Sequence, residues 1–366
     1  MADPELLSTR SRVADSLEAV NNLYYARGWS DGLPIVPPTE ARVLAMLRYT
    51  DRDAQDVVAD IPPKGGQATI EKLAINAVMA GCLPQYLPVI VTAIQALTEA
   101  PFNLYGIQAT THMAAPLAIV NGPIAKELEM NAGYNAFGQG TRANATIGRA
   151  IRLALMNIGG GRPGVLDRAT FGHPGKYTYC VAENQEESPW EPLHMELGYA
   201  PEDSTVTVVG AEAPHNVNDH GSTEGRGILI TCAGAIASPS TNNVYLGGKQ
   251  VLVLGPEHAA TVARDGFSKA DVRQFVWEHA TLPLGRFHPE NVDRFLRMHP
   301  DWCPPDRDPN HLVHALKSPE NLMVVVIGGA GKHSAVIPTF GDTQPVTRRI
   351  EREDGTPVRS IEELKQ

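Results

Sequence analysis

Histidine, cysteine and carboxylate side chains gather in one stretch of the chain, residues 171–220. Imidazole, thiolate and carboxylate groups are the protein ligands that iron, zinc, manganese and nickel use. The spacing suits loops, because it matches no established helix-borne pair of the HExxH kind. We therefore expect a metal-dependent enzyme, with one of these transition metal ions held mainly by His173, His194, His215 and His220.

The same stretch offers groups for acid–base or nucleophilic catalysis. Cys180 and Glu183 stand at the end of an expected strand, KYTYCVA, and Asp219 directly precedes His220. A carboxylate can orient a histidine as a general base, a role that suits the ordinary pKa of histidine. A plainer interpretation stays open, in which PHN and NDHG form turns and ENQEESP is a solvated acidic loop.

Glycine turns and one arginine suggest where an anionic group of the substrate would bind. Gly122 and Gly255 each precede a proline that begins a helix, where free N–H groups and the helix dipole favour an anion. Lys332 and His333 follow a similar turn, and Arg142 could contact a carboxylate through two hydrogen bonds. We expect a small carboxylate- or nitrogen-bearing substrate. Tight strand-to-helix packing at the turns, and an ordinary ion pair for Arg142, are the alternative explanations.

A thiol enzyme is the second functional hypothesis. The four cysteines are far apart and form no CxxC pair, so neither a zinc ribbon nor a disulfide scaffold is indicated. Cys82, before an apolar helix, or Cys180 could serve a thiol-based redox reaction, since a helix terminus can activate a thiol. A buried, inert cysteine is the common alternative. The run ILITCAGAIA places Cys232 in an expected core strand.

A noncatalytic subunit is the third hypothesis. Trp29, Trp190 and Trp302 lie in proline-rich segments, and aromatic residues of that kind often anchor interfaces. Such a subunit would use its loops to bind a partner chain. We also expect the protein to associate into a homo-oligomer.

Two segments that could position these residues resemble each other. AIVNGPIAKELEMNAGYNA (118–136) lines up with VLVLGPEHAATVARDGFSK (251–269) at a constant offset, and both predict a strand, a Gly-Pro turn, a helix and a glycine stop. A helix follows each copy, the second with a capping box from Ser268 to Asp271. A common βα connection would explain the likeness equally simply.

The elements predict an α/β fold of two related βα lobes, produced by internal duplication, after a helical N-terminal region. The expected borders are 1–105 for the helical region, 106–245 for the first lobe with the polar loops, and 246–366 for the second lobe. A site between equivalent lobes is the default expectation for such a fold.

Composition excludes several classes of protein. The 366-residue chain has a net charge of -10 and no cluster of lysine and arginine, so we expect no nucleic acid partner. Its longest apolar runs, such as 87–97, fall short of the roughly 20 residues of a membrane span. The first residues include acidic side chains and no apolar core, so no secretory signal is predicted, and we expect a cytoplasmic protein.

Several segments over about residues 27–350 resemble a large bacterial family. They are GWSDGLPIVPPTEARVLAML, AGCLPQYLPVI, GIQATTHMAAPLAIVNGP, GTRANATIGRAIRL, PGKYTYCVAENQEESPWEPLH and GPEHAATVARDGFSKADVR. Members of that family occur beside short proteins with a UGSC-type motif that contains cysteine or selenocysteine. The resemblance implies a soluble enzyme or enzyme subunit in a hetero-oligomer with thiol or metal redox chemistry, and a small thiol or selenol partner protein. This chain contains no UGSC sequence, so the resemblance assigns no catalytic residue to it.

Overall fold

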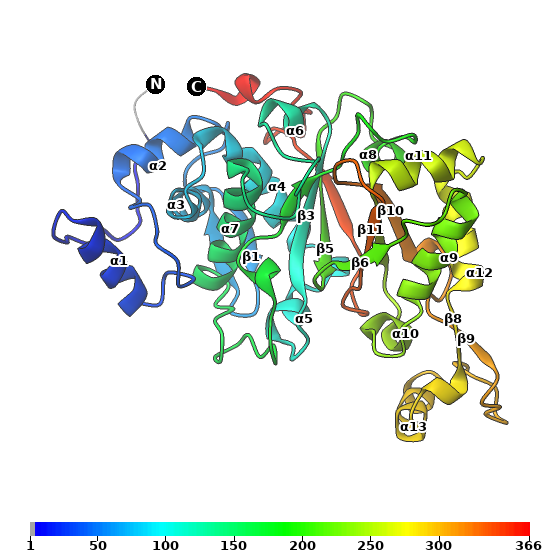
Figure 1. The fold of residues 1–366 in the computed structure, drawn as a ribbon. Helices are drawn as coiled ribbons and strands as arrows, with labels where there is room; N and C mark the ends of the chain where they lie inside the picture. The colour runs from blue at the N-terminus through cyan, green and yellow to red at the C-terminus, as the bar shows by residue number, and fades with distance from the viewer. Residues whose placement is uncertain (1–3) are drawn as a thin grey trace. The chain divides into compact units, whose positions relative to one another are not determined.

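Each of two units of the molecule has a four-stranded sheet at its centre (Figure 1). The computed structural model describes residues 4–366. Of these, unit 1 takes the residues up to Glu183 together with Leu193–Gly210 and Gln344–Gln366, and unit 2 takes Asn184–Pro192 and Ala211–Thr343. The predicted α/β class is confirmed. The expected borders at 105 and 245 fall inside unit 1 and unit 2 respectively.

Unit 1 begins with helices and one short hairpin. These elements are α1 (Leu17–Ala26), α2 (Glu40–Leu47), β1 (Val57–Ile61), β2 (Gly66–Thr69), α3 (Ile70–Ala80), η1 (Pro84–Tyr86), α4 (Leu87–Leu97), η2 (Ala100–Phe102) and α5 (Leu104–Ala109). Helix α3 begins where the Thr69 hydroxyl accepts a hydrogen bond from the Lys72 N–H, and it ends at Gly81, whose φ is 91°. In α4 every residue except Gln95 is buried, so this helix is part of the core of unit 1.

No single helix within residues 4–366 is long and apolar enough to cross a membrane. The pair Pro84–Leu97 and Ala100–Ala109, bent by 76°, reaches that length and composition only when its two parts are taken together.

The sheet of unit 1 has the strand order β12-β5-β3-β4. Its strands are β3 (Ala115–Asn121), β4 (Cys180–Ala182), β5 (Thr205–Ala211) and β12 (Val346–Arg349), and the remaining helices of the unit are α6 (Pro123–Glu127), α7 (Arg142–Asn157), η3 (Pro174–Lys176), α8 (Leu193–Glu196) and η6 (Ile361–Leu364). Strands β3 and β4 are parallel, with Ala118 opposite Cys180, and β12 runs antiparallel to β5. The long helix α7 packs against α3 and α4.

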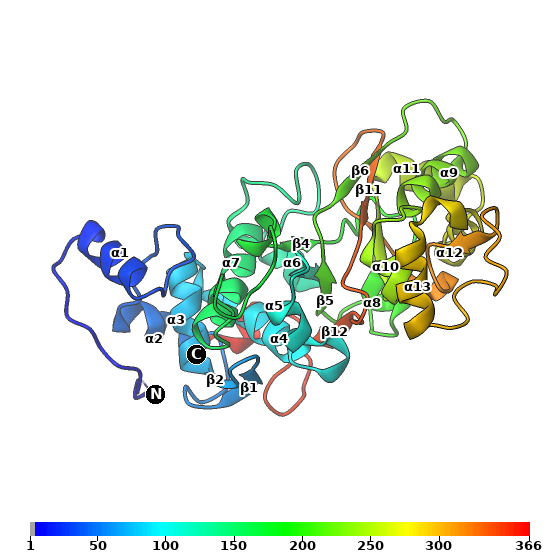
Figure 2. The same cartoon turned by 90° about the horizontal axis from the view of Figure 1, so that it is seen from below.

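The sheet of unit 2 has the strand order β10-β7-β11-β6, in which β10 is parallel to β7, and β11 is antiparallel to both of its neighbours. Helices α9, α11 and α12 lie together beside this sheet in both views (Figure 2). The elements are β6 (His215–Asn218), α9 (Gly225–Ile236), α10 (Asn242–Leu246), β7 (Gln250–Leu254), α11 (Pro256–Arg264), α12 (Lys269–His279), β8 (Thr281–Pro283), η4 (Leu284–Arg286), α13 (Pro289–Met298), β9 (Leu312–His314), η5 (Pro319–Asn321), β10 (Leu322–Val326) and β11 (His333–Ile337).

Two local predictions in unit 2 have clear outcomes. The capping box of α12 is confirmed, because the Ser268 hydroxyl accepts from the Asp271 N–H and the Asp271 carboxylate accepts from the Ser268 N–H. The expected strand at Cys232 is wrong, since this residue lies in helix α9. Ile228, Cys232 and Ile236 recur at every fourth position and are buried together in the core of unit 2, which is helical periodicity.

Candidate functional site

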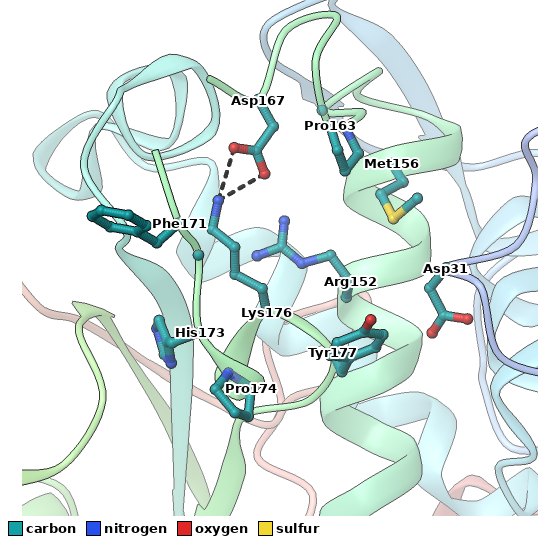
Figure 3. A pocket seen from close by; sticks show the side chains of 12 residues that line it. Asp31, Arg152, Met156, Pro163, Asp167, Phe171, His173, Pro174, Lys176 and Tyr177 are labelled. Carbon is teal, nitrogen blue, oxygen red and sulfur yellow. Dashed lines mark hydrogen bonds and ion pairs between the residues drawn. The ribbon is translucent and has the colours of Figure 1, made fainter. Parts of the chain in front are cut away.

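A cavity of about 350 Å³ opens in unit 1 between helix α7 and the segment 161–177 (Figure 3). Arg152 and Met156 reach it from α7, and Lys176 reaches it from η3. Asp31 borders it from the N-terminal segment. The other lining residues are Gly161, Pro163, Asp167, Phe171, Gly172, His173, Pro174 and Tyr177.

Arg152 is the most unusual residue of the cavity. Its side chain lies on a helix whose surrounding residues are apolar, and only 8% of the residue is exposed. Its guanidinium group makes no hydrogen bond or ion pair with any residue in the range 4–366. Burial lowers the pKa of this group, and the more distant charge of Asp167 opposes that effect. A buried guanidinium without hydrogen-bond partners is costly, so this one is suited to an anionic ligand.

Lys176 and Asp167 form a partly buried ion pair beside Arg152. The Lys176 ammonium group donates to the two Asp167 carboxylate oxygens at 2.8 and 2.7 Å, as the dashed lines in Figure 3 mark. Burial lowers the pKa of Lys176, the Asp167 carboxylate opposes this, and the charge of Arg152 lowers the pKa further. Asp31, the other carboxylate at the cavity, is already bound to Arg149 by two hydrogen bonds of 2.8 Å. Arg152 and Lys176 against Asp167 therefore leave one positive charge in excess.

The rest of the cavity wall is largely apolar or aromatic. Phe171 and Tyr177 are exposed at 84% and 49%, so their rings are accessible to a ligand that enters from solvent. His173 lies beside them; its Nδ1 atom accepts from the Gly175 N–H at 3.1 Å, and its ring meets the Tyr179 ring edge-on. These contacts orient the His173 ring, whereas the aromatic and proline side chains offer surface for a carbon skeleton.

The four histidines expected to bind a metal lie on separate elements of the two units. His173 precedes η3 and His194 is buried in α8, both in unit 1, whereas His215 begins β6 and His220 follows it in unit 2. Among the described residues, no three or more His, Cys, Asp or Glu side chains form a group that could hold a metal ion. The geometry therefore lends no support to the four-histidine site.

Cys180 and Glu183 are held inside unit 1. Glu183 is 2% exposed, and its carboxylate accepts hydrogen bonds from the Asn121 side chain and from the Leu193 N–H. These contacts tie the end of β3 to the start of α8. Cys180 and Cys82 are both buried and unlinked, and burial raises the pKa of each thiol to about 12. Both are protonated at neutral pH, which disfavours a nucleophilic role.

Because Cys82 and Cys180 are buried, we expect both thiols to react slowly. At pH 7.5, Cys82 and Cys180 of the folded protein should react with iodoacetamide at least about a thousandfold more slowly than free cysteine, because the thiolate fraction falls with each unit of pKa. Mass spectrometry of the alkylated protein measures the rate, and the same reaction in urea provides the control. Rapid labelling of either residue in the folded protein would support the thiol hypothesis instead.

The residues expected to bind an anion have structural contacts. The Arg142 guanidinium donates to the Gly81 carbonyl oxygen at 3.0 and 2.9 Å and so closes the end of α3. At Gly122 an added Cβ would overlap the carbonyl oxygen of Asp203, and at Gly255 it would overlap that of His333. These glycines permit close backbone packing, which was the alternative explanation for both turns.

Asp219 does not orient His220 as a general base. Its carboxylate accepts from the Ser222 N–H, the Ser222 hydroxyl and the Thr231 hydroxyl at 2.7 to 2.9 Å. Burial alone would raise the pKa of Asp219, but these hydrogen bonds outweigh it and lower the pKa. Instead, the Nε2 atom of His220 lies 3.1 Å from that of His333. Lys332 donates to the His220 carbonyl oxygen at 3.4 Å.

Arg152, Asp167 and Lys176 were not among the site residues predicted from the sequence. One signal was present for Arg152: it interrupts an apolar run in the second half of α7, where a charged residue must be buried with its neighbours. Nothing comparable distinguishes Asp167 or Lys176, whose surroundings in the sequence are those of an ordinary polar loop.

The chain matches no model of a known protein family and no curated protein sequence. A functional assignment must therefore rest on the chemistry of the cavity in unit 1. That chemistry combines an unpaired guanidinium group, an adjacent ion pair and an apolar wall.

Proposed function

We propose that unit 1 is an enzyme domain that binds a small monocarboxylate, or an anion of similar shape, through Arg152. The observation that carries this proposal is the guanidinium group itself, which is buried at the cavity and has no hydrogen-bond partner in residues 4–366. Guanidinium donors form a planar fork that matches a carboxylate through two parallel hydrogen bonds. A ligand carboxylate would supply the acceptors that Arg152 lacks.

The size and charge of the cavity favour a small monoanion. Its volume of about 350 Å³ lies at the lower end of the range for small-molecule sites. One positive charge in excess would be neutralised by a single carboxylate. The same charge disfavours a divalent cation, because Arg152 and Lys176 would repel it. Phe171, Tyr177 and Met156 offer apolar surface for the remainder of the molecule.

In this proposal Lys176 transfers a proton to or from the bound molecule. The lowered pKa of Lys176 makes its neutral form more accessible than that of an exposed lysine, which is the condition for a general base or acid. Asp167 holds the ammonium group in place through both carboxylate oxygens. Arg152 would fix the substrate carboxylate beside this pair.

Binding of small monocarboxylates tests the proposal. Isothermal titration with a panel from acetate to benzoate should identify at least one that binds the wild-type protein, and Arg152→Met should weaken that binding at least about tenfold, since a charged hydrogen bond contributes about 1.5–3 kcal/mol. The matched control is Arg142→Met, because that guanidinium contacts only the Gly81 carbonyl in the described structure. Equal binding by wild type and Arg152→Met, or equal binding of the uncharged amides, would contradict the proposal. Failure of the whole panel would also count against it.

We also propose that the two units derive from one duplicated βα element. In each unit a strand, β3 or β7, ends at Gly-Pro and two helices follow, and a later strand, β4 or β10, pairs with the first strand in parallel. In unit 2 the segment from β8 to β9 lies between the helices and β10. The sheet orders β12-β5-β3-β4 and β6-β11-β7-β10 correspond strand for strand. The outermost strand of each sheet comes directly after a strand of the other unit in the chain: β6 of unit 2 follows β5 of unit 1, and β12 of unit 1 follows β11 of unit 2. This reciprocal order supports a duplication better than the Gly-Pro turns alone.

Association with other chains stays a prediction. It includes the homo-oligomer, the small thiol or selenol partner protein and membership of the bacterial family described above. The cytoplasmic location is likewise a prediction.

A further inference from the structure

A pair of histidines lies at one end of the β6–β11 ladder in unit 2. His333, the first residue of β11, is in register with Asn218, the last residue of β6, and His220 follows two positions later. The Nε2 atoms of the two histidines are 3.1 Å apart, and their rings meet at 77° with centroids separated by 4.8 Å. Both side chains are exposed to solvent. Residues 113 positions apart are thus brought together at the surface.

A third histidine, His258 of α11, contacts a chain neighbour of each member of this pair. It is 2% exposed, and its Nε2 atom lies 3.0 Å from the Asp219 carbonyl oxygen, which can only accept a hydrogen bond. The Nε2 atom therefore carries the proton, and Nδ1 accepts from the Ser334 hydroxyl at 2.8 Å. Burial lowers the pKa of His258, with the Asp219 interactions opposing it, so its neutral form is favoured. Asp219 and Ser334 are the chain neighbours of His220 and His333.

We propose that His220 and His333 together bind one late first-row divalent metal ion, such as Cu²⁺, Ni²⁺ or Zn²⁺, through their Nε2 atoms. Neutral imidazole is a preferred ligand of these ions. With metal–nitrogen bonds of about 2.0–2.1 Å, a separation of 3.1 Å corresponds to a nitrogen–metal–nitrogen angle of about 100°. That angle lies between the square-planar and the tetrahedral values. Water completes the coordination, since both side chains face solvent.

The site differs in two ways from the four-histidine site that the sequence suggested. Its second ligand is His333, and both of its ligands belong to unit 2, whereas His173 and His194 belong to unit 1. The nearest carboxylate in the sequence, Asp219, is occupied by Ser222 and Thr231. Lys332 is the charged neighbour and opposes cation binding, so the affinity should be that of two imidazoles without help from a carboxylate.

Titration of the untagged full-length protein with CuCl₂ and NiCl₂ at pH 7.5 tests the site. We expect one equivalent to bind, with Cu²⁺ tighter than Ni²⁺, and His220→Ala or His333→Ala to weaken binding at least tenfold. The electron paramagnetic resonance spectrum of the Cu²⁺ complex should show coupling to imidazole nitrogens in the wild type. His215→Ala is the matched control, because this exposed histidine belongs to the same ladder and pairs with Val336 outside the site.

Several outcomes would overturn the assignment. One is that the wild type binds no equivalent of either ion, in which case the pair is only an imidazole–imidazole hydrogen bond. Another is that His333→Ala binds the metal ion as tightly as the wild type. A third is that His215→Ala weakens metal binding as much as His220→Ala does. Circular dichroism of each variant separates loss of ligands from loss of folding. The Arg152→Met variant should bind the metal normally, so failure here is distinguishable from failure of the carboxylate proposal.

Discussion

Gly122→Ala is expected to lower the free energy of unfolding by about 3–5 kcal/mol, among the largest losses that a single substitution causes. Gly122 has a φ of 90°, which disfavours any residue with a Cβ atom. The added Cβ would also overlap the Asp203 carbonyl oxygen and approach the Ser204 Cα atom to 2.6 Å. These are backbone atoms, and the Ser204 hydroxyl holds them in place by accepting from the Ile124 N–H at 3.0 Å. The end of β3 therefore has no room to adjust.

Gly198→Ala provides the matched control in the same unit. Gly198 has a φ of 88°, almost that of Gly122, but no atom lies within 4 Å of the position that its Cβ would take. The free energy of unfolding of Gly198→Ala should therefore fall only by the contribution of backbone strain, about 1–2 kcal/mol. Urea unfolding followed by far-ultraviolet circular dichroism measures both variants. Equal losses of unfolding free energy in the two variants would show that the neighbouring backbone moves away from the added Cβ at Gly122. Backbone strain alone would then explain the need for this glycine.

Asp167→Asn is expected to destabilise unit 1 by about 2 kcal/mol, between the values for exposed and fully buried pairs, because it removes one partner of a partly buried ion pair and leaves the other charge uncompensated. Here the change leaves two cations, Lys176 and Arg152, in one cavity whose remaining carboxylate, Asp31, is already bound to Arg149. A second change, Arg152→Met, should recover much of the loss. Urea unfolding of the two single variants and the double variant measures this coupling. Additive effects would mean that Arg152 and Asp167 do not interact, and would weaken the charge argument for the cavity.

The loss of stability in Asp167→Asn should depend on pH, and its direction follows from the pKa of Lys176. The pKa of Lys176 is lowered by burial in the wild type, and loss of the Asp167 charge removes the interaction that opposes this effect. The folded variant therefore binds fewer protons than the unfolded chain at pH values between the lowered pKa and the ordinary value of about 10.4. Stability must rise with pH across that interval, so the deficit relative to the wild type should shrink as the pH approaches about 10. A saturating carboxylate ligand should reduce the deficit as well, since it would supply the missing negative charge.

The α/β class and several helix boundaries could be predicted from the sequence. Pro123 and Pro256 begin helices α6 and α11, and the Ser268–Asp271 capping box begins α12. These features depend on residues within about four positions of each other, so the local sequence contains the necessary information. Even at this level a short apolar run was ambiguous: ILITCAGAIA suggested a strand, whereas its buried residues follow helical periodicity in α9.

The candidate sites were predictable only in part. The stretch 171–220 does contain His173 and Lys176 of the cavity and His220 of the histidine pair. Arg152 comes from helix α7 and His333 from a strand more than a hundred residues after His220. Residue types in the stretch suggested metal ligands and a thiol nucleophile, yet burial raises the pKa of Cys180 and hydrogen bonds engage Glu183.

Helix starts such as those at Pro123, Pro256 and Ser268 follow from the local sequence, because capping and turn formation act between near neighbours in the chain, whereas the short apolar run around Cys232 did not reveal its helix. The tertiary structure alone decided that Arg152 faces a cavity without a partner, that Asp167 neutralises Lys176, and that His333 meets His220. The contacts at the cavity depend on the path of the segment that connects α7 to η3, and the contact between the two histidines depends on strand order. The order β10-β7-β11-β6 places β11 beside β6, and no local property of either strand specifies that neighbour.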